Sequence, residues 1–171
     1  MISSSVRIRL CALFCLLALL LSGCGGHRSV TPRDAVMAMC RAEVPLPCGK
    51  VYVRSAPQDS AEHLSDRLLT AILGNGSLPP EIDLAEDIAL FFSYTHPCEF
   101  AAFLCKNADG TDAVAQLCLR RLDVLRAYWD QRGSKFAAYT DRATVTVRGR
   151  WVILCVSSDP DAAMRALRRT L

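Results

Sequence analysis

The sequence lacks the short motifs that mark most enzymes. It contains no phosphate-binding Walker loop, no glycine-rich dinucleotide fingerprint, no Gly-x-Ser-x-Gly nucleophile turn and no His-Glu-x-x-His zinc helix. No Cys-x-x-Cys occurs, although the chain has nine cysteines, so a thioredoxin-like redox site has no support. These absences favour a protein that binds over one that catalyses, and we predict no catalytic residue, no metal site and no cofactor.

The sequence also lacks a large excess of charge of either sign. It has 20 Lys and Arg against 17 Asp and Glu, a formal charge of +3. Removal of Arg7 and Arg9 with an N-terminal segment would leave +1. Because nucleic-acid binding requires a strongly basic face, we expect no nucleic-acid partner.

The apolar run near the start is too short to span a bilayer comfortably. Leu10–Leu21 follows the basic Arg7 and Arg9 and ends in Leu21-Ser22-Gly23-Cys24. A basic start, a run shorter than the roughly 20 residues of a spanning helix, and small residues at its end are typical of a secretory signal. The last four residues match the lipobox of bacterial lipoproteins. We therefore predict a signal peptide over residues 1–23 and lipid on the Cys24 thiol.

Lipid on Cys24 would anchor the protein to the cell membrane, facing outside the cytoplasm. Buried acyl methylenes contribute about 0.8 kcal/mol each, so two acyl chains hold a protein stably where one does not. Residues 24–31 would then form a polar tether, of which residues 25–31 reach roughly 20 Å when extended, and residues 32–171 would form one α+β domain. The alternatives are an uncleaved membrane helix or an ordinary signal peptide with an incidental cysteine.

Six cysteines remain in the predicted mature chain. Three stand in apolar patterns and are expected to fill the core as small hydrophobic residues. These are Cys105, Cys118 and Cys155. The other three stand near predicted loops, and we expect them to be the ones that form disulfides, since exported proteins meet oxidising conditions. These are Cys40, Cys48 and Cys98.

The spacing of apolar residues predicts an α+β fold. Helices are expected over residues 32–42, 61–73, about 112–132 and 160–171, and strands over 51–53, 88–94, 99–105, 143–148 and 151–157. Two β-hairpins, each followed by a helix, would build an antiparallel sheet with the N-terminal helices packed on it. The strand at 51–53 is expected at an edge.

Several local contacts follow from the same patterns. Ser60 is expected to cap the second helix, because its hydroxyl can accept a hydrogen bond from a backbone N–H of the first turn. Arg126 and Asp130 are expected to form an ion pair one helical turn apart. Val145 and Val147 are expected to point inward from their strand.

His63, His96 and Cys98 are the best candidates for chemistry. His96-Pro97-Cys98 places an imidazole and a thiol in one turn, as a Cys–His nucleophile or a zinc site would require. Glu99 is the nearest acid, but adjacent strand residues point to opposite faces. The simpler interpretation is a hairpin turn with an exposed histidine and a paired or idle cysteine.

Two groups of charged residues also have two interpretations. Acidic residues gather at Glu81, Asp83, Glu86 and Asp87; we interpret them as a solvated face, since a calcium loop needs a glycine-bearing spacing that is absent. Arginines of the two C-terminal helices are interpreted as solvated, or as contacts to an anionic surface polymer or lipid headgroups. They are Arg120, Arg121, Arg126, Arg165, Arg168 and Arg169.

The second half of the chain resembles a known family. Glu99-Phe100-Ala101-Ala102-Phe103 is similar to its acidic-apolar strand, and an arginine-bearing helix follows. Gly149-Arg150-Trp151-Val152 and Val156-Ser157-Ser158-Asp159 resemble its closing hairpin and helix cap. The family comprises small lipoproteins of clostridial-type bacteria, catalogued as a domain of unknown function (four-three-five-eight). The resemblance implies a lipid-anchored domain and brings no activity or site residues; the many cysteines depart from it.

These observations together predict a lipid-anchored extracytoplasmic lipoprotein. We expect it to be a binding or interaction module at the cell envelope that contacts an envelope protein or a small ligand. The alternative is an envelope enzyme, or a thiol- or metal-handling protein, that uses His96 and Cys98.

Overall fold

A five-stranded antiparallel sheet, with the strand order β1-β2-β3-β5-β4, forms the centre of the fold. The structure, a computed structural model, describes residues 29–171. The strands are β1 (Lys50–Val53), β2 (Ala85–Phe92), β3 (Glu99–Cys105), β4 (Thr144–Arg148) and β5 (Trp151–Val156). The predicted α+β class and both predicted hairpins are confirmed, and β1 lies at an edge as expected.

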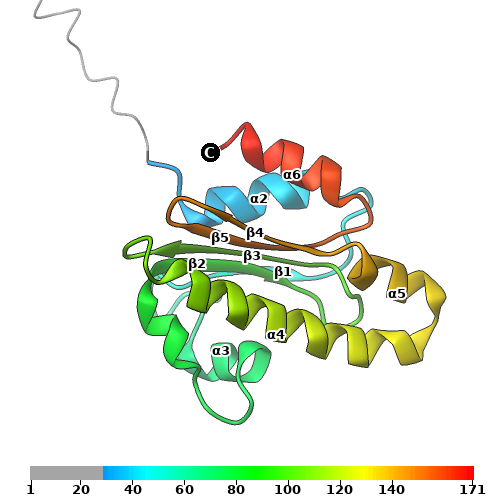
Figure 1. The fold of residues 1–171 in the computed structure, drawn as a ribbon, viewed down its shortest axis with the longest axis horizontal. Helices are drawn as coiled ribbons and strands as arrows, with labels where there is room; N and C mark the ends of the chain where they lie inside the picture. The colour runs from blue at the N-terminus through cyan, green and yellow to red at the C-terminus, as the bar shows by residue number, and fades with distance from the viewer. Residues whose placement is uncertain (1–28) are drawn as a thin grey trace, which may run out of the picture.

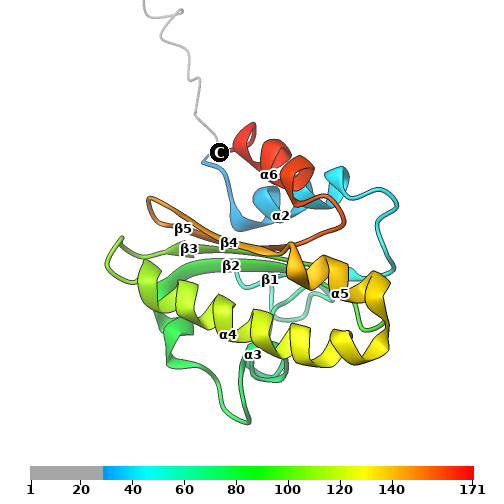
Figure 2. The same ribbon diagram turned by 45° about the vertical axis from the view of Figure 1, so that its right-hand side comes forward.

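Helices cover both faces of this sheet (Figures 1 and 2). On one face lie α2 (Pro32–Ala42) and α6 (Pro160–Arg168). On the other lie α3 (Asp66–Leu73), α4 (Thr111–Trp129) and α5 (Ser134–Asp141). None of these helices, within residues 29–171, is both long and apolar enough to cross a bilayer.

The alternation of β3 explains why its sequence is apolar throughout. Phe100 and Ala102 belong to the apolar cluster beneath α2 and α6, whereas Ala101 and Phe103 belong to the cluster beneath α4. Successive strand residues face opposite sides of a sheet. A strand covered on both sides must therefore be apolar at every position.

The second predicted helix begins later than expected. Helix α3 begins at Asp66, and the Ser65 hydroxyl accepts the backbone N–H of Leu68, so the prediction that Ser60 caps a helix over 61–73 is wrong. Instead, the chain before Ser65 extends the sheet edge: the Leu64 N–H donates to the Val53 carbonyl oxygen at 3.0 Å. Backbone pairing with β1 therefore replaces the first turns of the predicted helix.

Other local predictions also need correction. Helix α5 was not predicted, and Arg126 pairs with Asp123, at 3.5 Å, rather than with Asp130. Val147 is 45% exposed instead of pointing inward, because β4 is the outermost strand of the sheet.

The acidic segment is not simply a solvated face. Glu81 pairs with Arg120 of α4 at 2.5 Å. Asp87 accepts hydrogen bonds from the backbone and the hydroxyl of Ser55, and Glu86 pairs with an arginine of the β4–β5 turn. These acids therefore connect separate parts of the chain, and β2 begins among them at Ala85, earlier than expected.

Candidate functional site: an aromatic pocket at one end of the sheet

The residues singled out from the sequence have different surroundings. Cys24, the predicted lipidation site, lies outside the described residues. His63 lies beside β1, where its Nδ1 is 2.9 Å from the carbonyl oxygen of Ala56. His96 and Cys98 do come together, but through the backbone: the Cys98 N–H donates to His96 Nδ1 at 3.1 Å.

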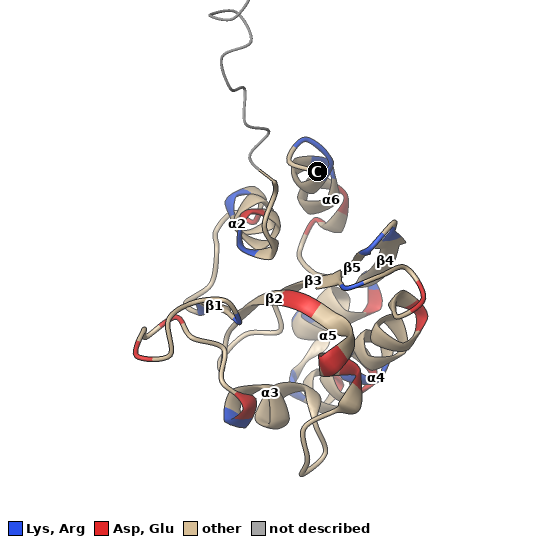
Figure 3. Ribbon diagram, turned by 90° about the vertical axis from the view of Figure 1, so that its left-hand side faces the viewer, with Lys and Arg blue, Asp and Glu red and all other residues tan. Residues whose placement is uncertain are grey.

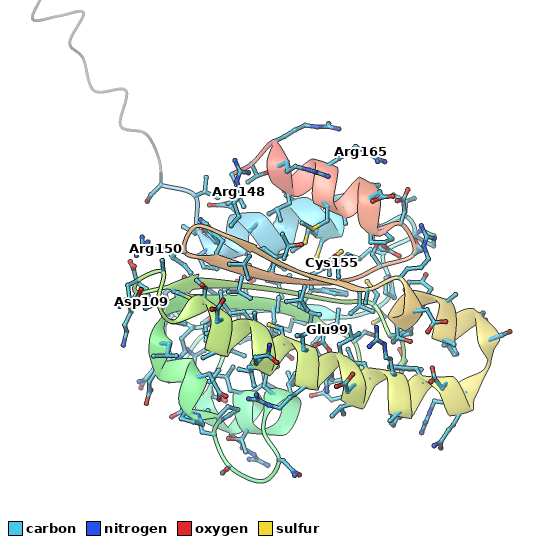
Figure 4. All side chains as sticks on the ribbon, in the orientation of Figure 1. Glu99, Asp109, Arg148, Arg150, Cys155 and Arg165 are labelled. Atoms are coloured by element: carbon cyan, nitrogen blue, oxygen red, sulfur yellow. The ribbon has the colours of Figure 1, made fainter. Side chains whose placement is uncertain are left out.

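The environment of Cys98 does not suit a nucleophile. Its side chain is fully buried, and burial raises the pKa of its thiol, with the charge of Glu43 adding to the effect. Because the thiolate is the reactive form, such a thiol is unreactive at neutral pH. Glu99 lies on the opposite, α4 side of the sheet (Figure 4), so the geometry gives no Cys–His–Glu arrangement.

The cysteines behave differently from the sequence expectation. All six described cysteines are free, and only Cys48 among them is exposed. Cys105, Cys118 and Cys155 are core residues as predicted, but Cys40 and Cys98 are buried too. Cys98 does lie in the turn between β2 and β3, and Cys40 in the last turn of α2, but neither of them nor Cys48 is paired in this structure, so the expectation that these three form disulfides is wrong here. Burial raises the pKa of both Cys40 and Cys155 to about 12.

His96 lies where segments that are distant in the sequence meet, and we call this meeting point the joint. Its ring packs edge-on against Tyr139 of α5, with centroids 4.7 Å apart. Burial lowers its pKa; the charge of Glu43 opposes this shift and that of Lys135 reinforces it. Glu43, at the end of α2, is itself buried and accepts the Ser157 hydroxyl. This joint holds α2, α5 and the end of β5 together.

A buried ion pair lies at the same end of the sheet, on the α4 side. Arg121 of α4 and Glu99 of β3 make two hydrogen bonds: Nη2 to Oε2 at 2.6 Å and Nε to Oε1 at 3.0 Å. Their side chains are only 10% and 3% exposed. Burial works against the charged guanidinium, but the adjacent carboxylate outweighs it and raises the pKa of Arg121. Arg121 is therefore not a solvated helix arginine, which corrects the sequence interpretation.

Next to this ion pair is a pocket of about 190 Å³. Its walls are mainly aromatic and come from the end of β2 and the second half of α4; we call it the aromatic pocket. It is lined by Phe92, Ser93, Tyr94, Arg121, Val124, Leu125, Tyr128 and Trp129.

The rings of the aromatic pocket are held in fixed orientations. Phe92 and Tyr94 meet edge-on, with centroids 4.7 Å apart, and Tyr128 and Trp129 do so at 5.0 Å. The Arg121 guanidinium lies 5.8 Å from the centre of the Phe92 ring. Edge-to-face pairs of this kind are favourable beyond their buried area, so they stabilise the ring orientations that shape the pocket.

The chemistry of the aromatic pocket favours binding. Its one charged lining residue, Arg121, is neutralised by Glu99. None of the described residues that line it is a His, Cys, Asp or Glu, the usual carriers of nucleophilic and acid–base catalysis. The Ser93 hydroxyl already donates to the Cys48 carbonyl oxygen at 2.7 Å. The pocket can therefore hold an apolar or aromatic group.

Sequence reasoning missed this site because its parts lie far apart in the chain. Phe92 ends β2 and Tyr94 follows in the turn after it, whereas Tyr128 and Trp129 end a helix some thirty residues later. The useful signal was Glu99: an acid at the start of an otherwise apolar strand requires a buried partner. The arginines of the following helix were the candidates.

No family model, curated protein or solved structure matches the chain. The described residues also contain no group of three or more His, Cys, Asp or Glu placed to hold a metal ion.

Proposed function

We propose that the protein is a lipid-anchored extracytoplasmic binding module, and that the aromatic pocket receives an apolar or aromatic group of an envelope protein or a small ligand. The anchor is supported by the sequence around Cys24. The observation that carries the binding function is the pocket, with its exposed aromatic rim.

The rim of the pocket is unusually apolar for a surface. Tyr94 is 73% exposed, Val124 58% and Tyr128 47%, whereas Trp129 beneath them is 6% exposed. Clustered exposed apolar side chains mark interaction sites. Aromatic residues and arginine are also the types that dominate binding energy in interfaces.

The preferred ligand group follows from the charge and shape of the pocket. Because Glu99 neutralises Arg121, the ion pair beside the pocket carries no net charge and does not favour an anionic group. The edge-to-face walls suit a flat ring or a short apolar chain, which can contact a ring face on one side and a ring edge on the other. A neutral apolar or aromatic group is therefore the expected occupant.

The anchor is tested by the intact mass of the native protein extracted from membranes. A chain that begins at Cys24 and carries diacylglycerol is the expected result. A chain that begins at Met1, or a cleaved chain without lipid, would refute the anchor.

The pocket is tested by site-specific photo-crosslinking of the membrane-bound protein. A photoreactive residue at Val124, on the pocket rim, is expected to give a defined adduct, while the same residue at Asp123 is the control because its side chain is 74% exposed and it does not line the pocket. Tyr94→Ala should weaken the Val124 adduct without affecting the fold, since Tyr94 is largely exposed. Equal crosslinking from both positions, or none from Val124, would contradict the proposed site.

A further inference from the structure

The outer surface of α2 and α6 carries exposed arginines. Three of them line a groove of about 410 Å³ between the two helices, together with several alanines. A fourth, on α6, and a fifth, at the end of β4, line the neighbouring groove. We call these five the basic face: Arg41, Arg148, Arg165, Arg168 and Arg169. Figure 3 shows basic residues along the outer sides of α2 and α6, and Figure 4 labels Arg148 and Arg165 on that side of the sheet.

The arginines of the basic face differ from those of α4. Within residues 29–171, none of the five makes an ion pair. On the opposite side, Arg120, Arg121 and Arg126 of α4 all have acidic partners. The basic face therefore gathers five arginines that lack an ion-pair partner, with Asp161 as the one acidic residue that lines the same two grooves.

The rest of the described chain does not share this charge. The full sequence has 20 basic and 17 acidic residues, and Arg7, Arg9 and Arg28 lie outside the described part. Residues 29–171 are thus formally neutral, and the uncompensated arginines on one face create an electrostatic asymmetry. Such an asymmetry orients a protein in front of a charged surface.

The predicted lipid site lies on the same side. The described chain begins at residue 29, directly before α2 (Figure 1). Cys24 precedes that point by five residues, which reach about 18 Å at most. A lipid on Cys24 would therefore hold the α2–α6 side close to the membrane.

We propose that the basic face docks on the anionic headgroups of the membrane that holds the lipid anchor. This inference rests on the proposed anchor. Each arginine near an anionic leaflet strengthens attachment about five-fold, within a screening length of about 8 Å at physiological salt. Docking on this side directs the α4 side of the sheet, and with it the aromatic pocket, away from the membrane.

The test uses the native protein extracted from membranes, with the lipid that it carries, reconstituted into two kinds of vesicle. One is phosphatidylcholine alone, and the other also contains phosphatidylglycerol. Amide hydrogen exchange is measured on each. On the anionic vesicles, α2 and α6 are expected to exchange several-fold more slowly than on the neutral ones, while α4 is unchanged, and added salt should remove the difference.

Matched charge reversals sharpen the result. Arg165→Glu with Arg168→Glu should abolish the extra protection of α2 and α6, whereas Arg67→Glu with Arg126→Glu, the same charge change on α3 and α4, should preserve it. Exchange in β3 reports whether each variant remains folded. Equal exchange on both vesicles, or loss of protection in both variants, would overturn the inference and leave the anchor intact. The binding of the protein to each kind of vesicle is also measured by flotation. A protein that floats only with the anionic vesicles would refute the anchor but support docking by the basic face. A protein that floats with neither kind would overturn both.

Discussion

The ion pair between Arg121 and Glu99 is the most deeply buried ion pair among residues 29–171. Removing one partner leaves an uncompensated buried charge, which typically costs 3–5 kcal/mol. We expect Arg121→Met to lower the free energy of unfolding by about 3–5 kcal/mol, measured by urea denaturation. Glu99→Leu combined with Arg121→Met should restore much of this loss, because neither charge then remains buried.

The control for this experiment is on the same helix. Arg126 has a side chain that is 41% exposed and only a loose contact with Asp123. Arg126→Met should change the free energy of unfolding by no more than about 0.5 kcal/mol. Similar losses at Arg121 and Arg126 would mean that burial of the ion pair does not determine its contribution.

His96 makes stability depend on pH in a defined direction. Burial lowers its pKa below the ordinary 6.5, so the unfolded chain takes up the proton first as the pH falls. The contribution of neutral His96 to stability is therefore fully present above about pH 6.5 and decreases as the pH falls toward the pKa of the folded state. An NMR titration of the His96 ring should show that lowered pKa.

The matching variant is His96→Asn, which keeps an acceptor for the Cys98 N–H but does not titrate. The free energies of unfolding of the native protein and the variant should be compared at pH 8 and pH 5 (about one and a half units on either side of the ordinary value). The native protein should lose more stability on acidification than the variant. Equal losses would show that His96 does not contribute to the acid sensitivity.

At the scale of elements, α3 begins later in the structure than the apolar pattern of the sequence predicts. The Ser65 hydroxyl accepts the Leu68 N–H at 3.3 Å, and replacing a capping serine by alanine costs about 1 kcal/mol. Ser65→Ala should therefore lower the free energy of unfolding by about that amount, while Ser65→Asp, which also caps, should preserve it. A neutral Ser65→Ala would argue against this start of the helix.

Elements whose local signals agreed with their tertiary surroundings could be predicted from the sequence. Helix α6 begins where Asp159 and Pro160 indicate, with the Asp159 carboxylate accepting the Ala162 N–H, and β3 has its predicted bounds. In contrast, residues 61–64 have a helical pattern, yet residues 61–62 form a turn, and backbone hydrogen bonds join Glu62 and Leu64 to Val53. Local periodicity contains no information about such a long-range partner.

Helix α5 and the aromatic pocket could not be predicted from the sequence, for related reasons. Helix α5 has only one fully buried residue, Thr140, so its apolar stripe is weak. Its Phe136 and Tyr139 pack on His96, and the local pattern does not indicate this contact between distant parts of the chain. The pocket depends similarly on the end of β2 meeting the end of α4. A buried acid such as Glu99 was the one signal in the sequence that required a distant partner.

At the scale of the whole molecule, the two faces of the sheet have different roles in our proposals. The α2–α6 side has uncompensated arginines and the start of the described chain, and the α4 side has the aromatic pocket. A lipid anchor on the first side and a ligand on the second would use the thickness of the domain to separate membrane from partner. The joint of Glu43, His96 and Tyr139 connects the two helical layers.

The fold as a whole protects the buried thiols from alkylation and oxidation. Five of the six described cysteines are buried and Cys48 is exposed. Burial also raises the pKa of Cys98, Cys118 and others, which suppresses the thiolate that oxidation requires. Alkylation of the native protein followed by mass measurement should modify Cys48 alone among these six, and unfolding without reductant should expose all of them. Pairs that resist alkylation after unfolding would instead reveal disulfides, and would show that an oxidising compartment, rather than the packed core, decides the state of the cysteines.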